Sequence, residues 1–136
     1  MSAIITTYDI VMKDGADPST STASGNLNGD RYSVIMPVTR AFMGELHLHW
    51  VAGPVGKMIV QVSNDEGALD DEGINRINSN NIVTNWIEQT SGTIGSTDSS
   101  VRFALSDIGY RWVRLFWDST SGTGNISSFR ASFKGY

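Results

Sequence analysis

Apolar and polar residues alternate with a period of two along several short stretches of the chain, and this pattern limits the fold more than any other feature. The stretch "GELHLHW" (44–50) shows it most regularly, with two alternating sets of residues: Leu46, Leu48 and Trp50 against Glu45, His47 and His49. Such alternation places one set on each face of a β-strand, whereas few windows repeat with the 3.6-residue period of a helix. The pattern predicts an all-β protein.

About eight strand-like stretches follow one another, separated by residues that favour turns. They cover residues 4–12, 31–38, 44–52, 57–63, 82–90, 100–106, 110–118 and 125–135. Pro37 indicates a strand end or an edge position, because proline lacks the N–H that a central strand needs. Many short strands with glycine-rich turns are typical of an antiparallel β-sandwich or jelly roll. The length of 136 residues fits a single domain spanning 1–136.

Two long polar segments interrupt the strands. Residues 13–30 are rich in Ser, Gly and Asn and offer little to bury, so we expect a flexible loop or arm there. Residues 64–81 form an acidic, Asn-rich insertion between two strands. We expect this insertion to be a surface feature.

The composition disfavours several classes of function. The chain has no cysteine, which excludes disulfides, thiolate zinc sites and cysteine nucleophiles. Its 10 basic residues are scattered among 14 acidic ones, so a nucleic-acid partner is not expected. The N-terminus lacks the pattern of a secretory signal, and no apolar run approaches the roughly 18 residues of a membrane span. We therefore expect no membrane partner.

The two histidines of the chain, His47 and His49, are candidate metal ligands. Residues two apart on a strand project from one face, and Glu45 lies on that face as well. A His-x-His strand is similar to the metal-binding strand of cupins, but here no acidic residue follows at the cupin spacing and no third histidine exists. We therefore interpret this face as an ordinary polar strand face and expect no metal or cofactor.

The sequence does not favour a calcium site or a catalytic site. The insertion offers oxygen donors that suit calcium, but it lacks the spacing of an EF-hand loop; they are Asn64, Asp65, Glu66, Asp70, Asp71 and Glu72. No nucleophile elbow, phosphate-binding loop or dinucleotide fingerprint is present, so we expect a protein that is not an enzyme, without catalytic residues.

The tryptophans could form a platform that stacks against sugars; they are Trp50, Trp86, Trp112 and Trp117. Both faces of the strand at 110–118 carry large apolar groups, however, which indicates a central strand covered on both sides. We therefore expect core packing for most of these rings. An exposed Trp would favour sugar binding.

The second half of the chain resembles small structural proteins of tailed bacteriophages. The order of short motifs carries the resemblance over about 44–136: "MIVQVSND" (58–65), Trp86, "GSTDSSVRFALSDIGYRWVRLFW" (95–117) and "SGTGNISSFRASFKG" (121–135). Asp107 and Gly109 suit a tight corner that delivers Tyr110 into the sheet, as in the tyrosine corner of immunoglobulin-like sandwiches. Gly122 and Gly124 suit a hairpin into the last strand.

The resemblance implies a non-enzymatic virion component, assembled in the host cytoplasm. Such a protein would be a capsid decoration protein that binds the major capsid protein on the head exterior as a homo-oligomer, often a trimer, or else a neck or tail component. A contact by edge pairing of residues 4–12 is one expected mode. Because "YRWVRL" (110–115) is also similar to strands of galactose-binding-like jelly rolls, a carbohydrate-binding module of a tail appendage is the alternative.

Overall fold

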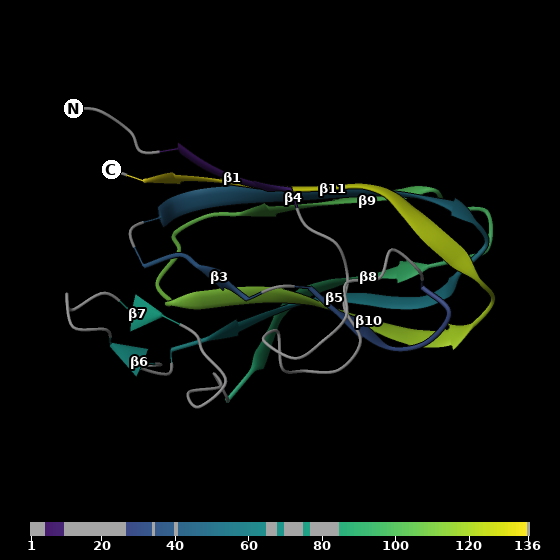
Figure 1. Ribbon diagram of the computed structural model, residues 1–136, viewed down its shortest axis with the longest axis horizontal. Coiled ribbons are helices and arrows are strands. Elements are labelled where there is room, and N and C mark those ends of the chain that lie inside the picture. Colours follow the sequence, from purple (N-terminus) through teal and green to yellow (C-terminus); the bar gives the residue numbers. More distant parts are fainter. Residues whose placement is uncertain are drawn as a thin grey trace.

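The computed structural model is a two-layer antiparallel β-sandwich, which confirms the predicted fold class (Figure 1). It describes residues 5–9, 27–33, 35–39, 41–64, 68–69, 75–76 and 85–135. The strands are β1 (Ile5–Asp9), β2 (Arg31–Tyr32), β3 (Met36–Pro37), β4 (Ala41–Ala52), β5 (Val55–Ser63), β6 (Ala68–Leu69), β7 (Asn75–Arg76), β8 (Ile87–Ile94), β9 (Ser100–Leu105), β10 (Trp112–Ser121) and β11 (Gly124–Gly135). Most of the predicted arm and of the acidic insertion, including its candidate calcium ligands beyond Asn64, lies outside the described residues.

The two layers are a four-stranded sheet in the order β1-β11-β4-β9 and a five-stranded sheet in the order β2-β10-β5-β8, with β3 also paired to β10. The strands β6 and β7 pair only with each other among the described residues. Every pairing is antiparallel. No helix in the described part of the chain is long and apolar enough to cross a membrane.

The tight glycine-containing turns carry the chain from one layer to the other. The turn at 53–54 joins β4 of one sheet to β5 of the other, and the turn at 122–123 likewise joins β10 to β11. The second turn is therefore not the hairpin that the sequence predicts, because the strands it joins do not pair. The two turns lie together, since the amide of Gly53 donates to the carbonyl of Thr123 at 3.1 Å. Gly122 has φ +75°, and a side chain there would overlap the carbonyl of Gly53.

The core lies between the sheets and is built from the inward positions that alternation predicts. On the inward faces of β4, β5 and β11 each residue is at most 7% exposed: Leu46, Leu48, Trp50, Met58, Val60, Val62, Phe129, Ala131 and Phe133. Gly44 makes room in this layer, because a Cβ there would overlap the ring of Phe133. The predicted faces of these three strands are confirmed.

Residues 27–30 belong to the folded domain and not to a flexible arm. Leu27 is 1% exposed, its amide donates to the carbonyl of Gly124 at 2.8 Å, and its carbonyl accepts from the indole of Trp117 at 3.0 Å. Asp30 accepts from the amide of Ser119 at 2.8 Å. A single apolar residue in a polar stretch shows no periodicity, so the sequence pattern missed this core position.

Two strand boundaries differ from the prediction. The strand expected over 31–38 is divided into β2 and β3, which both pair with β10 and leave Pro37 exposed at the sheet edge, as expected for proline. The strand expected over 82–90 is β8, which begins later and continues through a Ser-Gly-Thr sequence predicted as a turn. Pairing with β5 overrides the turn preference of those residues.

Candidate functional site

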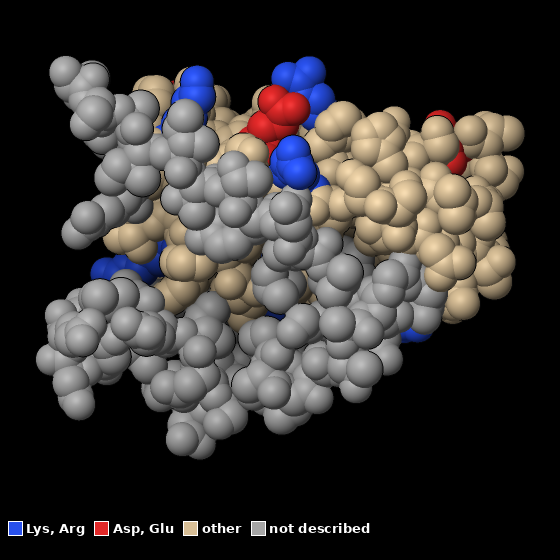
Figure 2. All heavy atoms as spheres, turned by 45° about the horizontal axis from the view of Figure 1, so that its top comes forward, with Lys and Arg blue, Asp and Glu red and all other residues tan. Residues whose placement is uncertain are grey.

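The outer face of the four-stranded sheet carries the polar residues of the opening stretch. Glu45, His47 and His49 occupy the alternate positions of β4 that leave the core to Leu46, Leu48 and Trp50, so their predicted outward orientation is confirmed. Figure 2 shows side chains of both charges gathered over this face.

His47 and His49 lie against each other on this face. Their ring centroids are 4.4 Å apart and the ring planes are inclined by 50°. The register places His47 between Arg102 of β9 and Arg130 of β11. Among the described residues, no three His, Cys, Asp or Glu side chains gather in a way that could hold a metal ion. The neighbours in register are thus cationic, which suits an anionic ligand better than a metal.

Glu45 is held by Arg102 in a two-point ion pair. The Nε of Arg102 lies 2.8 Å from one carboxylate oxygen, and its NH2 nitrogen donates to the other at 3.1 Å. Both side chains are well exposed, at 63% and 44%, so the pair adds little to stability. Its consequence is electrostatic, because the carboxylate of Glu45 is already paired with a guanidinium.

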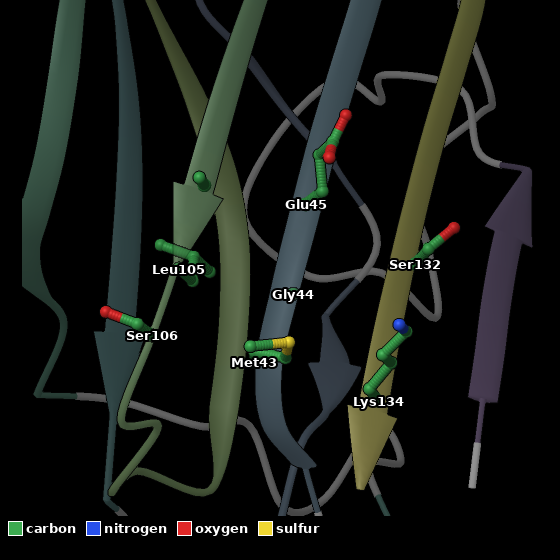
Figure 3. A pocket seen from close by; sticks show the side chains of 8 residues that line it. Met43, Gly44, Glu45, Leu105, Ser106, Ser132 and Lys134 are labelled. Carbon is green, nitrogen blue, oxygen red and sulfur yellow. The ribbon is translucent and has the colours of Figure 1, made fainter. Parts of the chain in front are cut away.

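Two adjoining hollows follow the strands β4 and β11. The larger, of about 390 Å³, spans β9, β4 and β11, and Figure 3 looks onto it. Its lining combines an apolar floor with one ammonium group: Met43, Gly44, Ala104, Leu105 and Lys134. The smaller, of about 230 Å³, includes His47 and Arg130, and both hollows share Glu45 and Ser132. We call the two together the β4–β11 groove.

The sequence predicts only part of this groove. Alternation correctly places Arg130 and Ser132 on the outer side of the last strand, opposite Phe129 and Phe133. It cannot tell that β11 and β9 flank β4, because register and neighbour order depend on the whole fold. Lys134, Ala104 and Leu105 were therefore missed as groove residues, and no local signal marks them.

On the opposite outer face, the side chain of Arg114 lies between two aromatic rings. Its guanidinium carbon is 4.4 Å from the ring centroid of Tyr32 and 4.2 Å from that of Trp86, while its Nε donates to the Oε1 of Gln61 at 2.7 Å. Burial lowers the pKa of Arg114 from its usual value to about 10, and an electrostatic interaction with Tyr32 partly offsets this effect. Arg114 therefore remains charged at neutral pH, and its role here is to fasten neighbouring strands.

The four tryptophans do not form an exposed platform. Trp50, Trp112 and Trp117 are each at most 2% exposed, which confirms the expectation of core packing for most of them. Trp86 is half-buried and one face of its ring covers Arg114. The large apolar side chains that the described residues do expose are aliphatic: Met43, Val51 and Ile87.

The strand β1 lies at one edge of the four-stranded sheet. Its five residues pair with β11 from Ile5 opposite Lys134 to Asp9 opposite Arg130, and no described strand pairs with its other side. An edge strand of this kind can accept a strand from another chain.

The motifs that carry the phage resemblance meet around the start of β10. The side chain of Asn64 and the carbonyl of Ser63 both accept from the amide of Arg111, each at 3.1 Å. Asp107 adopts the left-handed conformation with φ +49°, as a tight corner requires. The hydroxyl of Tyr110 is buried without a hydrogen-bond partner in the described structure, so the bond that defines a tyrosine corner is absent.

Comparisons with known proteins show similarity of fold only. No protein-family model and no curated protein sequence matches the chain. Among solved structures, the SPBc2 prophage-derived protein YomS is similar at 9% identity and a TM-score of 0.46, covering 99% of this chain and 96% of YomS. Chitosan-binding module 1 of a chitosanase/glucanase from Paenibacillus sp. IK-5 is similar at 17% identity and a TM-score of 0.45, covering 98% of this chain and 94% of that module. The family 29 carbohydrate-binding module CBM29_1 from Piromyces equi is similar at 15% identity and a TM-score of 0.47, covering 97% of this chain and 91% of that module. These similarities indicate no function for this chain.

Proposed function

We propose that the protein is a non-enzymatic structural component of a tailed-bacteriophage particle, which binds the major capsid protein on the head exterior as an oligomeric decoration protein. The observation that carries the proposal is the convergence of the residues on which the phage resemblance rests. Asn64 holds the amide of Arg111, and Trp86 covers Arg114, so motifs far apart in sequence support the same strand. Because residues of separate motifs contact the same part of the structure, we infer that the motifs belong to one common arrangement and do not match the phage proteins by chance.

The edge strand β1 provides a mode of attachment. A strand from a capsid subunit that pairs with the outer side of β1 would extend the four-stranded sheet through main-chain hydrogen bonds. Such pairing needs no particular side chain on either partner. Strand pairing would therefore explain binding to the repeating capsid subunits without a cluster of specific side chains.

A carbohydrate-binding module is less well supported by the described residues. Sugar recognition relies on an aromatic ring that is exposed beside polar groups, because sugar C–H groups stack on the ring face. The described exposed apolar residues are aliphatic, and Trp86 uses a ring face on Arg114. A neck or tail role would use the same edge strand, and only binding to separated particle parts distinguishes it from a head role.

The proposal is tested by sedimenting the purified protein with empty heads and, separately, with purified tails of its phage. We expect the protein in the pellet with heads and in the supernatant with tails. Binding to tails alone would move the assignment to the neck or tail. Binding to neither, together with binding on a glycan array, would replace the proposal by carbohydrate binding.

A further inference from the structure

We propose that the β4–β11 groove is a contact between copies of this chain and that its occupant is the acidic segment 68–72, "ALDDE", of a second copy. The contact deepens the oligomeric part of the proposed function and rests on it, but it forms in solution and is testable without particles.

The floor of the larger hollow suits one aliphatic side chain. Met43, Ala104 and Leu105 line it with carbon, and Gly44 adds no side chain of its own. Its volume of about 390 Å³ lies near the lower end of the range typical of ligand pockets, roughly 300–1,000 Å³. None of the described residues that line it has an aromatic ring, which argues against a sugar and for a protein side chain.

The charges around the groove favour an acidic occupant. Lys134 stands at the larger hollow, and His47 and Arg130 stand at the smaller one. Glu45 is neutralised by Arg102, and Asp9 of β1 lies opposite Arg130 in register. Among the described strand positions of this face, Arg102, Arg130 and Lys134 outnumber Glu45 and Asp9, although the whole chain has a net charge of −4.

The acidic segment has one aliphatic residue for the apolar floor, followed by carboxylates for the basic groups. Leu69 is an aliphatic side chain, and Asp70, Asp71 and Glu72 follow it directly. In an extended chain the side chains of residues two apart lie about 7 Å apart on one side, so Leu69 and Asp71 can enter neighbouring hollows together. Residues 64–81 hold five acidic residues and one basic residue, against the basic excess of the groove.

The contact joins two different parts of the chain. In sequence the segment lies between β5 and β8, whereas β9, β4 and β11 form the groove. With the segment of one copy in the groove of the next, the groove of the first copy can receive the segment of a third. Such a contact is heterologous, because it joins different surfaces of the two copies. Repeating it forms a closed ring when the rotation between neighbouring copies brings the last copy back to the first.

Two variants that change the charge on opposite sides of the contact test the proposal. The groove variant is Lys134→Glu with Ala104→Glu, both at exposed positions, and the segment variant is Asp70→Asn, Asp71→Asn and Glu72→Gln. In sedimentation velocity we expect the wild type to self-associate and each variant alone to associate about tenfold more weakly or worse. The groove variant repels the acidic segment, and the segment variant has lost the charges that attract it to the groove. Lys57→Glu is the control, a charge reversal on the other sheet. It also breaks the 3.3 Å ion pair of Lys57 with Glu88, and it should still associate as the wild type does.

Mixing the two variants gives the decisive result. The segment variant keeps an intact groove and the groove variant keeps an intact segment, so the mixture should form one-to-one complexes and nothing larger. A wild type that is monomeric at every concentration would overturn the proposal, as would two variants that associate like the wild type. A mixture that stays monomeric would overturn it as well. Head binding by a protein that fails these tests would leave the assignment to the head exterior standing and remove only the contact between copies.

Discussion

Trp86 covers the guanidinium of Arg114, with 4.2 Å between the ring centroid and the guanidinium carbon. In sequence the two residues are separated by β8 and β9, so their contact ties the entry to β8 to the central strand β10. Tyr32 covers the other side of the same guanidinium and stacks on Phe116 with centroids 4.6 Å apart. This arrangement fixes the outer face of the five-stranded sheet.

Replacing Arg114 by lysine should destabilise the protein although the charge is kept. A lysine ammonium cannot lie flat between two rings or donate to Gln61 with the same geometry, so we expect a loss of about 1–3 kcal/mol. The free energy of unfolding in urea measures it. The control is Arg102→Lys at an exposed ion pair, where a change below about 1 kcal/mol is expected. Equal losses in the two variants would contradict the role given to Arg114.

Removing the hydroxyl of Tyr110 should not cost stability. The hydroxyl is buried without a partner in the described structure, and an unsatisfied polar group carries a desolvation penalty. Tyr110→Phe is therefore expected to be neutral or to stabilise the fold by up to about 1 kcal/mol. Thermal unfolding at neutral pH measures the change, and a clear destabilisation would show that the hydroxyl does have a partner.

The same variant predicts a change in alkaline stability. Burial raises the pKa of Tyr110 above its ordinary value of 10.0, so the folded state holds this proton more tightly than the unfolded state. The resulting stability is fully present below pH 10.0 and is lost as the pH rises through the folded-state pKa. Tyr110→Phe should consequently lose less stability than the wild type above that pH. Identical pH profiles of the two proteins would rule out this titration.

Leu27 should behave as a core residue although its neighbours in sequence are polar. It is 1% exposed, and Leu27→Ala is expected to cost about 2–5 kcal/mol through lost burial and the cavity it leaves. Val51→Ala, at a residue 57% exposed, should change the free energy of unfolding by no more than about 0.5 kcal/mol. If Leu27→Ala changed the free energy of unfolding only slightly in chemical denaturation, residues 27–30 would not be part of the folded core.

Gly44 should be coupled to Phe133. A Cβ at position 44 would overlap the ring of Phe133, so Gly44→Ala is expected to cost about 1–3 kcal/mol. Adding Phe133→Leu, which removes the ring, should make the alanine less costly than it is in the wild type. A double-mutant cycle measures this coupling, and strictly additive costs would contradict the contact.

The sequence predicts which way side chains face more reliably than it predicts which strands are neighbours. Period-two alternation placed Leu46 in the core and His47 outside, because that choice depends only on the strand itself. The turns at 53–54 and 122–123 look like hairpin turns, yet they cross between layers, since the choice of layer depends on distant pairing. The groove was missed for the same reason: Lys134 and Leu105 meet there only through the register of three strands.

The role of β1 in attachment is tested by deleting residues 1–12. If the edge strand carries the contact, the shortened protein should lose co-sedimentation with heads. A melting curve that keeps a single cooperative transition confirms that the remaining sandwich is folded. Undiminished co-sedimentation of the folded, shortened protein would exclude edge pairing as the mode of attachment.

The most direct test of the virion assignment is a binding curve of the full chain on empty heads, measured by quantifying the sedimented protein across increasing protein concentration. Decoration of a regular lattice predicts a saturable curve with a fixed number of copies per head, in a pellet that forms only when heads are present. A curve that rises without a plateau, or protein that remains in the supernatant at every concentration, would contradict the account.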